Sequence, residues 1–158
     1  MKLKANIFLL AIVPFWPRSR HNTTQSSYMA SKEIELGHYV DLATTAIKPL
    51  HDEAGRNARD DAILRDRALA MLEKMDFGQD GYFFVYDMHG RSLMHSREPD
   101  LVGRDLWTLR DPAGSLTIQQ LIAAAAQGDG YVRYVWHRPS TDKLAPRLGY
   151  VVPLPRWG

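Results

Sequence analysis

The sequence contains no cysteine. That absence excludes disulfide bonds, cysteine-ligated zinc, iron–sulfur clusters and a thiol nucleophile. An excess of one charge is also lacking, because 20 Lys and Arg residues stand against 18 Asp and Glu, for a formal net charge of +2. Nucleic-acid binders usually carry a clustered basic excess, so we expect no nucleic-acid partner. With 158 residues, 45% of them hydrophobic, the chain suffices for one domain with its own core.

The apolar run near the N-terminus is too short to span a membrane as a helix. Residues 5–16 follow Lys2 and Lys4 and are apolar except for Asn6 and Pro14. As a helix this run would cover about 18 Å, against a hydrocarbon core of about 30 Å. Residues 1–28 therefore indicate a signal-anchor that is retained or a signal peptide that is cleaved, and either would export the rest of the chain. The third interpretation is an ordinary buried segment.

Two helices are expected next. Apolar residues recur at steps of three and four from Met29 to Leu50, and Pro49 marks the end of this long helix or a kink in it. Its apolar stripe suits either a homodimer interface or packing against the protein's own sheet. A polar loop over residues 51–59 precedes a second helix that starts at Asp60.

The pattern then changes to that of strands. Residues 82–87 are aromatic and β-branched, and a turn ending at Gly90 returns the chain as a second strand over residues 91–95. A long connection over residues 96–114, a helix over 117–127 and strands over 131–138 and 148–154 follow. The fold class is therefore α+β, with the long helix on one face of an antiparallel sheet and the other face free for a ligand. Such a sheet usually has one more strand, so we expect that the last strand is missing and that the domain is truncated at its C-terminus.

Several motifs in order carry a family resemblance. They are DGYFFVYD from Asp80, MH at 94–95 followed by PDLVGRDLW from Pro99, GYVRYVWHRP from Gly130, LGYVV from Leu148 and PRWG from Pro155. Together they resemble the single Cache domain, over about residues 29–158. The resemblance implies a long helix packed on a PAS-like sheet, in the extracytoplasmic, non-catalytic sensing module of a bacterial chemoreceptor or sensor histidine kinase. It also implies the inner membrane as location, with the domain in the periplasm or outside the cell, and a possible homodimer through the long helix.

The resemblance further implies a pocket for a small organic acid or a similar metabolite. Strand alternation places Tyr82, Phe84 and Tyr86 on one face, and Tyr134 and Trp136 together on another strand. A buried carboxylate needs a cation and hydrogen-bond donors, for which we select Arg147, with Tyr150 beside it and His95 as a second donor. The loop carrying Trp107 would close over the ligand. The candidate ligand-binding residues are Tyr82, Phe84, Tyr86, His95, Trp107, Tyr134, Trp136, Arg147 and Tyr150. The same aromatic residues could instead be plain sheet core.

Other functions find little support in the sequence. We expect no cofactor and no metal, because the six histidines show no paired ligand spacing, and no phosphate-binding loop or dinucleotide motif is present. A hydrolase using His95 with Asp87 or Asp100 would need a nucleophile that no motif supplies. A truncated fragment that does not signal, or a periplasmic binding module, stays an alternative to the sensor.

Overall fold

The computed structural model describes residues 7–14, 22–54, 56, 60–154 and 157. Its strands are β1 (Ile7–Pro14), β2 (Tyr82–Asp87), β3 (Ser92–His95), β4 (Gly130–His137) and β5 (Leu144–Leu154). They form one antiparallel sheet in the order β3-β2-β1-β5-β4. The helices are α1 (Asn22–Ala54), α2 (Asp61–Lys74) and α3 (Thr117–Ala126), with a short 3₁₀ turn, η1 (Pro99–Leu101). The α+β class and the antiparallel sheet are confirmed.

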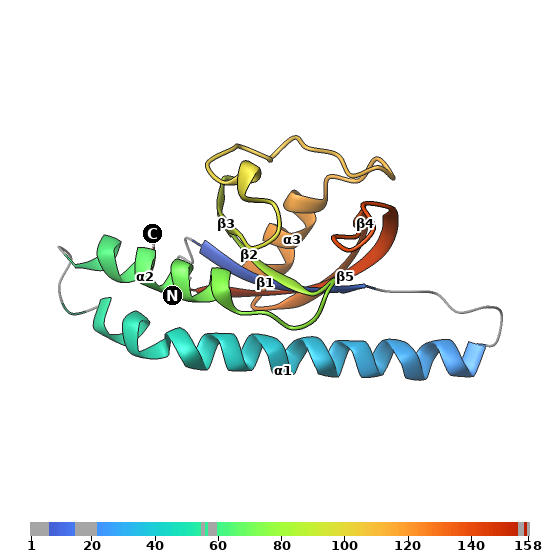
Figure 1. Cartoon of the computed structure of the whole chain (residues 1–158), viewed down its shortest axis with the longest axis horizontal. Helices are drawn as coiled ribbons and strands as arrows, with labels where there is room; N and C mark the ends of the chain where they lie inside the picture. Colours follow the sequence, from blue (N-terminus) through green and yellow to red (C-terminus); the bar gives the residue numbers. More distant parts are fainter. Residues whose placement is uncertain (1–6, 15–21, 55, 57–59, 155–156, 158) are drawn as a thin grey trace.

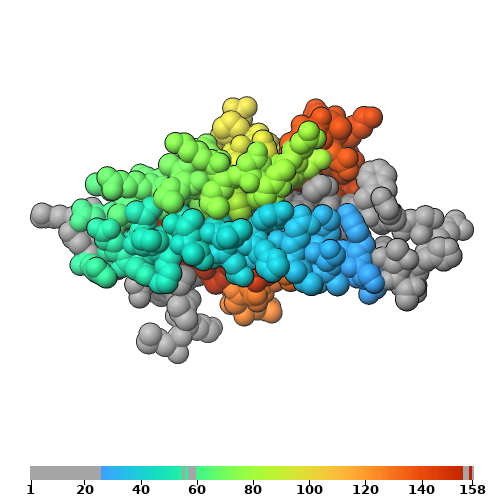
Figure 2. Space-filling view, turned by 60° about the horizontal axis from the view of Figure 1, so that its bottom comes forward, coloured from blue at the N-terminus to red at the C-terminus, as the bar shows by residue number. Residues whose placement is uncertain are grey.

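The helices lie on both faces of the sheet. Helix α1, 33 residues long, runs beneath it with α2 alongside, and α3 and the long connection lie above (Figure 1). Figure 2 shows α1 and α2 side by side across one face of the molecule. The apolar stripe of α1, which includes Leu36, Val40, Ala43 and Ile47, is buried in the core on this face. That stripe therefore packs on the protein's own sheet and does not form a dimer interface.

The N-terminal apolar run differs from the helical signal segment expected of it. Residues 7–14 form the central strand β1, in which Leu10 lies opposite Phe84 of β2 and Val151 of β5. A short apolar run fits a central strand as well as a helix, and here two strand edges satisfy its backbone hydrogen bonds. Residues 22–28 belong to α1, and the rest of the expected segment lies outside the described residues. No helix in the described part of the chain is both long and apolar enough to cross a membrane.

Strand β1 supplies a strand that the sequence analysis did not assign to the sheet. It separates β2 from β5 and pairs with both, so the described sheet has five strands and no gap in its hydrogen-bonded order. Elsewhere α1 continues through Pro49 to Ala54, beyond the expected end. Strand β5 starts at Leu144 rather than 148, because residues 144–147 pair with β4.

Two clusters of buried side chains fill the two sides of the sheet, and strand alternation explains how they divide. Phe83 and Val85 of β2 belong to the cluster shared with α1 and α2. Tyr82, Phe84 and Tyr86 belong to the other cluster, with Ile118, Leu121 and Ile122 of α3. The face opposite α1 is thus the one lined by the phenol groups.

Candidate functional site

A partly enclosed cavity of about 30 Å³ lies on the sheet face opposite α1. Its walls come from β2, β3, β4, α3 and the long connection between β3 and α3. The lining residues are Tyr82, Phe84, Tyr86, His95, Leu101, Leu106, Leu109, Asp111, Thr117, Ile118, Leu121, Tyr134 and Trp136. Six of the nine residues selected from the sequence are therefore brought together around one cavity.

Arg147 lies on the same sheet face, next to this cavity. It is opposite Tyr134 in the β4–β5 register, and its guanidinium carbon is 5.2 Å from the centre of the Tyr82 ring. The side chain is fully buried. One terminal nitrogen donates to the carbonyl of Asp80, but Nε and the other terminal nitrogen have no hydrogen-bond partner. A buried cation with unpaired donors is costly unless an anion approaches it, so this arrangement favours an anionic ligand.

The phenols beside Arg147 are neutral donors. Burial raises the pKa of Tyr82 to about 12, an increase that the nearby guanidinium partly opposes. Burial also raises the pKa values of Tyr86 and Tyr134. These hydroxyls therefore keep their protons at physiological pH and can donate hydrogen bonds to a ligand oxygen.

His95 is held as a neutral ring. Its Nδ1 accepts hydrogen bonds from the backbone N–H groups of Glu98 (2.9 Å) and Arg97 (3.3 Å), which leaves the proton on Nε2. The ring stacks on Phe84 at 5.3 Å, and burial lowers its pKa to about 4. No carboxylate pairs with either His95 nitrogen among the described contacts, and Asp87 instead accepts from the N–H groups of His89 and Arg91. This geometry gives no support to a His–Asp hydrolytic pair.

Two functional candidates were missed by the sequence reasoning. Asp111, 5% exposed, lines the cavity and accepts from the N–H groups of Ser115 (2.7 Å) and Val135 (3.1 Å). The buried hydroxyl of Thr117 lines the same wall and has no partner. The turn at residues 111–114 is visible in the sequence, but the contact between Asp111 and β4 joins residues 24 apart, which no local pattern reveals.

Glu98, the residue immediately before η1, lies near the cavity through a contact with Trp136. One of its carboxylate oxygens accepts from Nε1 of Trp136 at 2.8 Å, and Trp136 lines the cavity. The Glu98 charge also contributes to the raised pKa values of Tyr82 and Tyr86. A negative charge therefore lies close to the phenol groups.

Besides Arg147, which lies next to the cavity, two selected residues do not line it. Trp107 is 38% exposed on the long connection. Tyr150 lies on the opposite sheet face, where its hydroxyl donates to Asp129 at 2.6 Å and its ring stacks on Tyr131 at 4.5 Å. Strand alternation explains the second case, because Arg147 and Tyr150 are three residues apart in β5 and so point to opposite faces. Tyr150 is therefore not the neighbour of Arg147 that the sequence suggests.

Comparison with known proteins identifies relatives over nearly the whole chain. A family model described as single Cache domain 2 matches residues 28–158. The sensor histidine kinase MctS of Rhizobium johnstonii is 34% identical over 174 residues, which cover 99% of this chain and 37% of MctS. The methyl-accepting chemotaxis protein CtpM of Pseudomonas aeruginosa is 30% identical over 99% of this chain and 31% of CtpM. The chain thus spans about a third of the length of these curated relatives.

Solved structures show the same fold. A methyl-accepting chemotaxis protein from Vibrio parahaemolyticus superposes with a TM-score of 0.72 at 30% identity, covering 84% of this chain and 95% of that one. A Cache chemosensory domain whose structure is described as the basis for carboxylic acid recognition has a TM-score of 0.65 at 23% identity. It covers 81% of this chain and 97% of that one.

Proposed function

Because the chain belongs to the single Cache domain family, we propose that it senses a small organic acid in the cavity beside Arg147. Single Cache domains are extracytoplasmic sensor domains, and a related chemosensory domain recognises a carboxylic acid. The observation that carries the proposal for this chain is the buried guanidinium of Arg147 with two nitrogens that lack partners. A carboxylate is the group that pairs with such a cation in two parallel hydrogen bonds.

The uncharged donors near Arg147 suit an anionic ligand. Tyr82, Tyr134 and the Nε2 of His95 are all neutral donors, and donors stabilise a carboxylate without adding charge. The apolar side chains of the lining, such as Leu106 and Leu121, suit a short hydrocarbon portion. The cavity of about 30 Å³ holds only a few heavy atoms, so the ligand is small or the long connection moves to admit it.

We further propose that the domain serves as the input module of a membrane-bound kinase or chemoreceptor, as in its longer relatives. Helix α1 packs on the sheet face opposite the cavity, so a ligand that shifts the sheet also displaces α1. Such a shift is limited by the ligand's difference in affinity between the two conformations. The cofactor-free, non-catalytic role and the location outside the cytoplasm belong to the same proposal.

The homodimer is proposed through the outer face of α1 rather than through its buried stripe. Ile34 and Leu42, exposed by 61% and 64%, lie on that outer face. Analytical ultracentrifugation of the protein and of an Ile34→Glu, Leu42→Glu variant tests this. A concentration-dependent dimer that the double variant loses supports the proposal, and an unchanged dimer moves the interface elsewhere.

A thermal-shift comparison of propionate with propionamide tests the sensing function. The two compounds have nearly the same size, but only propionate carries a charge. We expect propionate to raise the melting temperature in a concentration-dependent way and propionamide to leave it unchanged. Equal shifts would show that charge plays no part in binding. No shift from any short carboxylate would contradict the proposed function.

A further inference from the structure

Negatively charged side chains outnumber positively charged ones around the cavity. No lysine or arginine is among the residues that line it, and Arg147 is the cation adjacent to it. One carboxylate, that of Asp111, is part of the lining. A second, that of Glu98, is outside the lining but accepts a hydrogen bond from the indole of Trp136, which is part of it. A ligand with one carboxylate satisfies the single cation. A second carboxylate on the ligand would enter a region that already holds two negative charges.

Neither carboxylate can readily turn away. Both oxygens of Asp111 are held by backbone N–H groups, from Ser115 and from Val135, and the residue is 5% exposed. Glu98 is fixed through Nε1 of Trp136 at 2.8 Å, and its backbone N–H donates to His95. In a partly buried site, like charges repel more strongly than in water because the medium screens them less.

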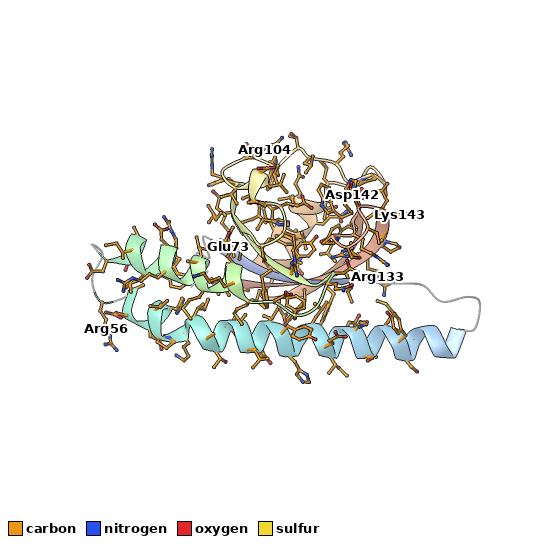
Figure 3. All side chains as sticks on the ribbon, in the orientation of Figure 1. Arg56, Glu73, Arg104, Arg133, Asp142 and Lys143 are labelled. Carbon is orange, nitrogen blue, oxygen red and sulfur yellow. The ribbon has the colours of Figure 1, made fainter. Side chains whose placement is uncertain are left out.

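The other nearby cations do not relieve this repulsion. Arg97 is exposed and pairs with Asp76 at 2.8 Å, and its backbone rather than its side chain contacts His95. Arg104 and Lys143 are exposed as well, and Figure 3 shows them at the outer margin of the layer above the sheet. His95 adds no positive charge, since burial lowers its pKa to about 4.

We propose that Asp111 and Glu98 make the cavity selective for short monocarboxylates over dicarboxylates of the same length. This inference rests on the proposed function, because it assumes that Arg147 receives the first carboxylate. Arg147 attracts the first carboxylate of a ligand, and the carboxylates of Asp111 and Glu98 repel a second one. The apolar residues Leu106, Leu109 and Leu121 then contact the hydrocarbon end of the ligand.

Calorimetric titration with two pairs of compounds tests the selectivity. Propionate is compared with malonate, and butyrate with succinate, at about pH 7.5 where all carboxyl groups are ionised. We expect each dicarboxylate to bind at least about tenfold more weakly than its monocarboxylate partner. Equal or tighter binding of malonate or succinate would overturn the inference while leaving the sensing of acids intact. No binding of any of the four would overturn both.

Variants assign the selectivity to the two residues. Glu98→Gln keeps an acceptor for Trp136 and removes the charge. It should therefore reduce the ratio of butyrate affinity to succinate affinity by about threefold or more, because a dianion gains more than a monoanion from the loss of a nearby negative charge. Asp111→Asn should act in the same direction, and its melting curve reports whether the loss of one backbone contact disturbs the fold. Asp100→Asn is the matched control, because Asp100 is an exposed carboxylate on η1. An unchanged ratio of butyrate affinity to succinate affinity in the folded Glu98→Gln and Asp111→Asn proteins would contradict the assignment.

Discussion

Arg147 and Tyr82, 65 positions apart in the sequence, place a guanidinium carbon 5.2 Å from the centre of a phenol ring. The first residue comes from β5 and the second from β2, two strands that β1 separates in the sheet. The pair joins a buried cation with unpaired donors to the wall of the cavity.

The unpaired hydroxyl of Thr117 should cost stability in the ligand-free protein. Thr117→Val keeps the shape of the side chain and removes a buried polar group without a partner. We expect the free energy of unfolding to rise by about 1 kcal/mol, measured by urea denaturation. A decrease of similar size would mean that the hydroxyl makes a stabilising hydrogen bond in solution.

His95 should make the domain less stable in mild acid. The pKa of this ring is about 4 in the folded protein against 6.5 for the free side chain, because burial disfavours the charged form. The unfolded chain therefore binds the proton first as the pH falls. The stability from keeping His95 neutral is complete above about pH 6.5 and is lost progressively toward pH 4, in total about 3 kcal/mol. Urea denaturation across this range should show a flatter pH dependence for His95→Gln than for the wild type, and parallel curves would contradict the assignment.

Gly90 should tolerate no side chain. Its φ is +84°, and a Cβ there would lie 3.0 Å from the Cα of Trp107. Gly90→Ala combines backbone strain with a clash against backbone, so we expect a loss of about 2 kcal/mol or more in the free energy of unfolding. Gly114→Ala is the control, because Gly114 has a φ of +88° with no atom within 4 Å of an added Cβ and should lose only about 1 kcal/mol. Equal losses would mean that the Trp107 loop moves aside.

A substitution at Leu10 tests whether residues 7–14 form the central strand of the sheet. A proline there removes a backbone donor from a strand paired on both sides, with Phe84 and with Val151. We expect Leu10→Pro to lower the free energy of unfolding by about 3 kcal/mol. Full stability in this variant would show that residues 7–14 are outside the sheet in solution, as a signal segment requires.

The sequence allowed the cavity wall to be predicted where strand alternation alone decides it. Tyr82, Phe84 and Tyr86 share a face because they are two residues apart, and Tyr134 and Trp136 do so for the same reason. The same rule argues against placing Tyr150 beside Arg147, and the error came from reasoning by nearness in sequence rather than by alternation.

Other features depend on contacts that no local pattern shows. Whether residues 7–14 form a strand or a helix depends on whether two strand edges are free to pair with them. A short apolar run in the sequence does not reveal this. Asp111 reads as part of a polar turn, and only its contact with Val135 brings it into the cavity wall. Trp107 is large and aromatic, which suggested a lid, but the folded connection leaves it exposed.

We expect Arg147 to bind the carboxylate of a small organic acid. The most direct test is a calorimetric titration of propionate into the Arg147→Met protein, with Arg67→Met as control, since Arg67 is an exposed residue of α2. Removing a buried cation with unpaired donors should leave the folded domain at least as stable, so the melting curve shows that the variant is folded. We expect a loss of propionate affinity of about 30-fold or more for Arg147→Met and unchanged affinity for Arg67→Met. Wild-type affinity in a folded Arg147→Met protein would contradict this expectation.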